Sequence, residues 1–115
     1  MAAKMLFFEK PSCTTCRKAK ALLINERVEF TSRDLDKESL SFDELDKLIG
    51  KRDYVEFLNS RNELFRRRKM KEHPPSREEA IRLMAKEPNL IRRPLLINGA
   101  QIVVGLDELA YRKLR

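Results

Sequence analysis

The sequence predicts an α/β fold in which helices flank a mixed four-stranded sheet. An apolar run at residues 4–9 is followed at once by a helical pattern at 14–25, and the alternating segment VEFTSRDL follows at 28–35. Two strand-like segments around a helix of this length suggest a right-handed βαβ unit with parallel strands. Later in the chain, two apolar runs flank Asn98-Gly99, which is the strongest short-range signal of an antiparallel hairpin.

The middle of the chain is helical in pattern. Ser41-x-x-Glu44 and Ser76-x-x-Glu79 both match the capping box that begins a helix, and apolar residues at helical spacing follow each. Residues 62–70 are a weaker helical candidate, and Asp107 is expected to cap a last helix. The residues that this last helix is expected to turn inward are Leu109, Ala110 and Leu114.

The chain of 115 residues is long enough for one compact domain but not for two independent ones. We therefore expect a single domain over residues 1–115, with the helices between about residues 40 and 90 inserted before the hairpin. No apolar run approaches the ~20 residues that cross a bilayer, and the segment MAAKMLFFEK has the pattern of a strand rather than of a signal peptide. The protein is therefore expected to be cytoplasmic, in a reducing compartment.

The chain carries a net charge of +7, which permits attraction to anions without identifying one. The densest basic cluster is RNELFRRRKMK at residues 61–71, and Phe65 is its single aromatic residue. A solvated helix face explains this cluster better than a nucleic-acid patch, because binding to single strands relies on interleaved aromatic side chains. Direct nucleic-acid binding is therefore not expected.

The only two cysteines form the motif Cys13-Thr14-Thr15-Cys16, at the point where the first strand gives way to the first helix. A cysteine at the start of a helix meets free backbone N–H groups and the positive end of the helix dipole. Both favour the thiolate, so Cys13 is predicted to be reactive with a lowered pKa. Cys16 lies one turn further, on the face shared by Ala19 and Leu23 that we expect to be buried.

Other interpretations of the cysteine pair fit less well. Tetrahedral zinc needs four ligands, whereas the chain offers two cysteines and the distant His73, so no metal site is expected. A structural disulfide between Cys13 and Cys16 would close a very short loop and stabilise little. Two inert buried thiols remain an alternative. In a cytosolic protein, however, a redox or nucleophilic cysteine is the best interpretation.

The chain resembles the arsenate reductase-like ArsC family, which includes the Spx and YffB-type proteins. The similar segments are PSCTTCRKAKALL, FLNSRN, LIRRPLLI and IVVGLDE, which occur in family order over essentially the whole chain. The resemblance implies a thioredoxin-like core with a helical insertion and a catalytic cysteine at Cys13. It also implies anion-binding arginines at Arg61 and Arg93, and a cis peptide before Pro94.

Two departures from the family pattern affect the expected function. Gly105 and Leu106 stand near the place of a third substrate arginine, and Cys16 is a feature of Spx-type proteins that the arsenate reductases lack. We therefore expect a thiol-disulfide oxidoreductase with Cys13 as nucleophile and Cys16 as resolving cysteine. Glutathione, glutaredoxin or thioredoxin would be its reductant, and no bound cofactor is expected. The alternative is a Spx-like redox-sensing regulator that binds the alpha subunit of RNA polymerase.

Overall fold

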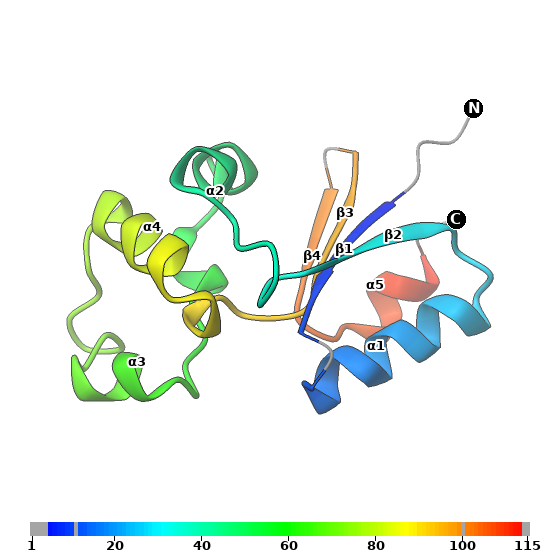
Figure 1. Cartoon of the computed structure of the whole chain (residues 1–115), viewed down its shortest axis with the longest axis horizontal. Helices are drawn as coiled ribbons and strands as arrows, with labels where there is room; N and C mark the ends of the chain where they lie inside the picture. Colours follow the sequence, from blue (N-terminus) through cyan, green and yellow to red (C-terminus); the bar gives the residue numbers. More distant parts are fainter. Residues whose placement is uncertain (1–4, 11, 100, 114–115) are drawn as a thin grey trace. The chain divides into compact units, whose positions relative to one another are not determined.

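The computed structural model describes residues 5–10, 12–99 and 101–113, and the chain divides into two compact units. Unit 1 comprises Met1–Glu38 and Arg93–Arg115, and unit 2 comprises Ser39–Arg92 (Figure 1). Unit 2 covers almost the same residues as the predicted insertion at about 40–90. The expectation of one domain over residues 1–115 stays a prediction.

Unit 1 contains the predicted mixed four-stranded sheet, in the order β2-β1-β3-β4. Strand β1 runs parallel to β2 and antiparallel to β3, and β3 and β4 form the predicted antiparallel hairpin around Asn98-Gly99. This is the thioredoxin-like arrangement. The strands and their crossover helix are β1 (Met5–Glu9), α1 (Thr14–Asn25), β2 (Phe30–Asp34), β3 (Leu95–Asn98) and β4 (Gln101–Val104).

The second strand begins later than the predicted residue 28, and the end of α1 explains why. The backbone N–H of Val28 donates to the carbonyl of Leu23 at 3.0 Å, and that of Arg27 donates to Ile24 at 3.0 Å. These two bonds are a Schellman motif, which satisfies the last carbonyls of the helix. Val28 is therefore part of the helix end, and pairing with β1 begins at Phe30.

The core of unit 1 lies between the sheet and two helices, α1 and α5 (Glu108–Arg112), which Figure 1 shows against the same side of the strands. Phe7, Leu96 and Val103 form one row across three neighbouring strands. Packed against this row are Ala19 and Leu23 from α1 and Tyr111 from α5.

The inner face of α5 differs from the prediction. Leu109 was expected to point inward but is 69% exposed, whereas Tyr111 is 1% exposed. The cap explains the phase of the helix, because Asp107 accepts the N–H of Ala110 at 3.1 Å and so sets where the first turn begins. Leu114, also predicted to face inward, lies outside the described residues.

Unit 2 is helical, and its core lies between the apolar faces of two helices that begin at the predicted capping residues. Ser41 accepts the N–H of Glu44 at 3.1 Å and Glu44 accepts that of Ser41 at 3.1 Å, a complete capping box. Ser76 accepts the N–H of Glu79 at 3.2 Å. The elements are α2 (Phe42–Ile49), η1 (Tyr54–Phe57), α3 (Glu63–Arg67), α4 (Arg77–Lys86) and η2 (Pro88–Leu90).

An arginine joins the two longer helices of unit 2. Arg77, in the first turn of α4, forms an ion pair with Asp46 at 2.6 Å and donates to the carbonyl of Gly50 at 3.1 Å. The guanidinium thus stabilises the negative end of α2. No helix among the described residues is long and apolar enough to cross a membrane.

Two substitutions on α5 test its observed phase. Tyr111→Ala removes a buried aromatic side chain and should lower the free energy of unfolding by about 3–5 kcal/mol. Leu109→Ala, on the exposed face, should change it by no more than about 0.5 kcal/mol. Urea denaturation followed by circular dichroism measures both. A larger loss at Leu109 than at Tyr111 would contradict the observed packing.

Candidate active site

The local structure at the end of β1 presents Cys13 at the first turn of α1. Cys13 is the N-cap residue, with an extended backbone, and its N–H donates to the carbonyl of Lys10 at 2.9 Å. The first turn of α1 carries no acidic side chain, so its positive end is not neutralised there. The Cys13 side chain is half-buried, and in this structure both cysteines are free thiols.

Cys16 has the buried position that the sequence predicts. It is 0% exposed, as are Ala19 and Leu23 on the same face of α1. The two sulfurs therefore differ in access, because a reagent from solvent can reach Cys13 and not Cys16.

The environment of Cys13 favours its thiolate. Partial burial on its own would raise the pKa of Cys13, but the backbone N–H and the thiol of Cys16, the charge of Arg93 and the N–H of Thr15 outweigh it. The pKa of Cys13 is therefore below its ordinary value, as predicted. Arg93 is a cation whose charge stabilises the thiolate. Lys10 forms an ion pair with Asp36, with 3.7 Å between its Nζ and the carboxylate.

The environment of Cys16 has the opposite effect. Burial is the largest influence and raises the pKa of Cys16, while the backbone of Lys10 and the charge of Arg93 lower it. The hydrogen bond and the negative charge of Cys13 also raise it, and together these influences raise the pKa of Cys16 to about 12. The pair is thus unsymmetrical, with a nucleophilic outer sulfur and a protonated inner one that donates to it.

Sheet pairing explains why Arg93 lies beside the cysteines. Because β1 and β3 are antiparallel and Phe8 pairs with Leu95, the end of β1 and the start of β3 lie at the same edge of the sheet. The Arg93–Pro94 peptide is cis, as the family resemblance implied. The Nε atom of Arg93 is buried, and Pro94 is buried too.

The other residues predicted from the family pattern have different positions. Arg61 is an exposed residue of unit 2, in the turn before α3, and its role in anion binding stays a prediction. Gly105 donates its N–H to the carbonyl of Pro94 at 2.8 Å, so it lies at the same edge as the cysteine turn. Leu106 packs partly buried against the core of unit 1.

Tyr111 is a residue of this region that the sequence reasoning missed. Its hydroxyl donates to the carbonyl of Gly105 at 3.4 Å. Burial raises the pKa of Tyr111, and negative charge on Cys16 or Asp107 raises it further, so it stays a neutral hydroxyl. The available signal was that Tyr111 is the only aromatic residue after Phe65.

The described part of the chain holds no cluster of three His, Cys, Asp or Glu side chains that could bind a metal ion. The two thiols, with the charge of Arg93 acting on both, provide the chemistry of a dithiol beside a cation.

The hydrogen bond that Cys16 donates to Cys13 predicts how alkylation of Cys13 depends on pH. The rate at which iodoacetamide modifies Cys13 should be half-maximal below pH ~8.5. Cys16→Ala removes the thiol that donates to Cys13 and should raise this midpoint. The rate is measured for the wild type and for Cys16→Ala by quenching the reaction at set times and detecting the product by mass spectrometry. An equal or lower midpoint in the variant would contradict the assigned hydrogen bond.

A second prediction concerns the two adjacent arginines. Arg93→Gln should raise the alkylation midpoint of Cys13, because it removes the positive charge that stabilises the thiolate. It should also weaken protection of Cys13 by sulfate about tenfold, the effect of losing one charge-assisted hydrogen bond. Arg92→Gln removes the same charge from an exposed neighbour and is the matched control. Equal effects of the two variants would rule out a specific role for Arg93.

The comparisons with known proteins identify one family. The model of the ArsC family matches residues 8–114. The global transcriptional regulator Spx of Bacillus subtilis (strain 168) is 30% identical over 108 residues, which cover 92% of this chain and 82% of Spx.

Two solved structures share the fold over most of the chain. The crystal structure of an ArsC family related protein from Bacteroides fragilis has a TM-score of 0.87 at 30% identity, covering 98% of this chain and 100% of that one. A possible arsenate reductase from Streptococcus mutans UA159 has a TM-score of 0.75 at 30% identity, with 90% and 91% covered. Together with the unsymmetrical cysteine pair and the cis-proline beside it, these matches show that the chain belongs to the ArsC family.

Proposed function

We propose that this protein is a thiol-disulfide oxidoreductase in which Cys13 is the nucleophile and Cys16 the resolving cysteine. The observation that carries the proposal is the opposite shift of the two thiol pKa values, downward at the accessible Cys13 and to about 12 at the buried Cys16. A nucleophile must be a thiolate at working pH, and a resolving cysteine must stay out of the first encounter with substrate.

In the first step the thiolate of Cys13 attacks one sulfur of a disulfide, RS–SR′. A bond forms between Cys13 and the SR group, the RS–SR′ bond breaks, and its electron pair leaves on R′S⁻, which takes a proton from solvent. Arg93 stabilises the thiolate beforehand. Its guanidinium also suits an anionic group on the substrate, because arginine makes planar, paired contacts with oxyanions.

The second step depends on a change at Cys16. Once Cys13 is in a mixed disulfide its negative charge is gone, and so is one of the influences that raise the pKa of Cys16. Cys16 then loses its proton to solvent and attacks the sulfur of Cys13, expelling RS⁻. The substrate has become two thiols, and the protein has given up two electrons to form the Cys13–Cys16 disulfide.

The reductant that restores the dithiol is an external thiol. Two molecules of glutathione, or one dithiol of a glutaredoxin or thioredoxin, would reduce the Cys13–Cys16 bond by the same exchange. By the family resemblance, Arg61 would also bind the anionic part of the substrate or of glutathione.

Arsenate is a poorer fit than a disulfide. By the family resemblance a third arginine would stand near Gly105 and Leu106, and neither supplies a positive charge. Gly105 has φ of 76° and Leu106 packs against the core, so an arginine at either place would carry strain or lose packing. We therefore expect arsenate reduction to be slow.

A second candidate function is redox-sensing regulation. It is favoured by the relative named as a global transcriptional regulator, which matches 92% of this chain. In this case formation of the Cys13–Cys16 disulfide would change the affinity for RNA polymerase through its alpha subunit. The same dithiol chemistry serves both functions, and the difference lies in whether many substrate molecules are turned over.

Steady-state turnover tests the enzymatic proposal. With glutathione and glutaredoxin present, a glutathione mixed disulfide should be reduced faster than arsenate, and Cys13→Ser should abolish both activities. Cys16→Ser should accumulate a mixed disulfide on Cys13, visible as added mass that dithiothreitol removes. Turnover of arsenate equal to that of the disulfide would defeat the substrate assignment, and undiminished turnover in Cys16→Ser would defeat the resolving role.

A binding experiment tests the regulatory alternative. Reduced and oxidised protein are each mixed with purified RNA polymerase alpha subunit, with Cys16→Ala as a control that cannot form the disulfide. Binding that depends on oxidation in the wild type alone, without multiple turnovers, would favour regulation over catalysis.

A further inference from the structure

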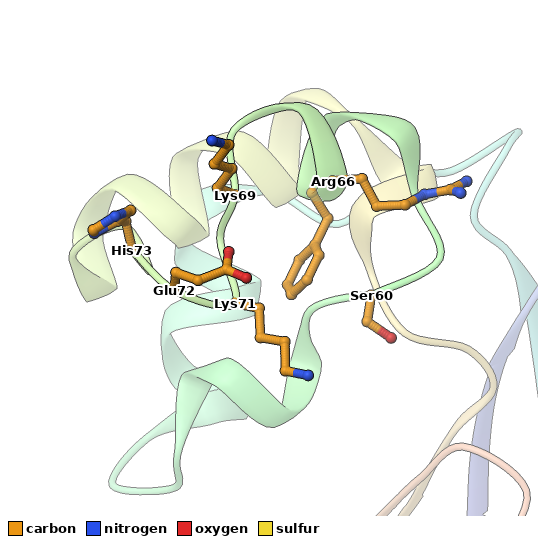
Figure 2. A pocket seen from close by; sticks show the side chains of 7 residues that line it. Ser60, Arg66, Lys69, Lys71, Glu72 and His73 are labelled. Atoms are coloured by element: carbon orange, nitrogen blue, oxygen red, sulfur yellow. The ribbon is translucent and has the colours of Figure 1, made fainter.

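Unit 2 contains a pocket of about 540 Å³ that the dithiol chemistry does not use. Its lining comes from the turn before α3, from α3 itself and from the loop that follows (Figure 2). The volume is within the range of roughly 300–1,000 Å³ that is typical of small-molecule sites. The residues that decide its chemistry are Phe65, Arg66, Lys69, Lys71 and Glu72.

The charges around this pocket are positive in excess, and of its three cations Arg66 donates a hydrogen bond to the carbonyl of Arg61 at 3.1 Å. Arg66, Lys69 and Lys71 face a single carboxylate, that of Glu72. Among the described residues, the side chains of Lys69, Lys71 and Glu72 form no ion pair or hydrogen bond, although neighbouring Arg68 pairs with Glu79 at 2.9 Å. In the view of Figure 2 the carboxylate of Glu72 lies between the side chains of Lys69 and Lys71.

The backbone at Lys69 adopts a left-handed conformation that is unfavourable for a lysine. The φ of Lys69 is 49°. Its backbone N–H donates to the carbonyl of Arg66, and the N–H of Met70 donates to the carbonyl of Phe65. These bonds place Lys69 at the left-handed position of a Schellman motif that ends α3, where glycine is the most stable residue. The lysine brings an ammonium group to the pocket rim, which glycine would not.

We infer that this pocket binds a nucleoside phosphate. Lys69 and Lys71, long side chains whose ammonium groups point in different directions in Figure 2, suit the oxygens of an extended phosphate group, and the part of Phe65 that lines the pocket suits a flat ring. Glu72 repels further negative charge but accepts hydrogen bonds from the N–H or O–H groups of a nucleoside. That combination disfavours a ligand that is anionic throughout, such as citrate. The inference is independent of the proposed redox function.

Calorimetric titration at 0.15 M salt, where long-range attraction to the charge of +7 is screened, tests the site. The probes are ADP, pyrophosphate, adenosine and citrate. ADP should bind saturably at one site, and about tenfold or more tightly than each of the other three. Absence of saturable ADP binding, or equal affinity for pyrophosphate or citrate, would overturn the assignment to nucleoside phosphates.

Three variants separate the site from general charge and from misfolding. Lys69→Gly should raise the urea midpoint of unfolding, because it relieves the left-handed backbone, yet should weaken ADP about tenfold. Lys71→Gln should weaken ADP similarly, whereas Lys51→Gln, an exposed lysine of the same unit, should leave affinity unchanged. Unaltered affinity in Lys69→Gly and Lys71→Gln, or an equal loss in Lys51→Gln, would overturn the proposal.

Discussion

The antiparallel pairing of β1 with β3 is the constraint on which the candidate active site depends. It brings the turn that leaves β1, where Cys13 begins α1, to the same sheet edge as the turn that enters β3, where Arg93 precedes the cis-proline. The helix supplies N–H groups and the shielded position of Cys16, and the strand pairing supplies the guanidinium.

Much of unit 1 could be predicted from the sequence, because its signals are local and agree with one another. The Asn98-Gly99 hairpin, the limits of α1 and the burial of Cys16 were predicted correctly. Each depends on a turn residue, a cap or a helical period within a few positions of the chain. The Arg93–Pro94 cis peptide came from the family resemblance, since nothing in the residues alone distinguishes cis from trans.

Two predictions were wrong because a single residue determines where a short helix begins or ends, and so which of its side chains are buried. On α5, the first turn is set by Asp107, and this placed Tyr111 inside and Leu109 outside. The helical candidate at residues 62–70 ended early because Lys69 adopts a left-handed backbone, a conformation that the lysine side chain itself does not predict. The pocket beside Lys69 could not be predicted for the same reason. The sequence shows that residues 61–71 are basic, but how their side chains are arranged depends on the turn at Lys69.

The burial of Cys16 also affects which chemical damage the protein could register. In the proposed mechanism, a disulfide or a sulfenic acid at Cys13 carries a leaving group that Cys16 displaces, which converts the modification into a reversible internal disulfide. An alkyl group on Cys13 carries no such leaving group, and the thiol of Cys16, which is 0% exposed, then does not react. With the second sulfur one helical turn behind the first, the protein would respond differently to two kinds of reagent. Oxidation of Cys13 would be reversible, whereas alkylation of Cys13 by an electrophile would be permanent.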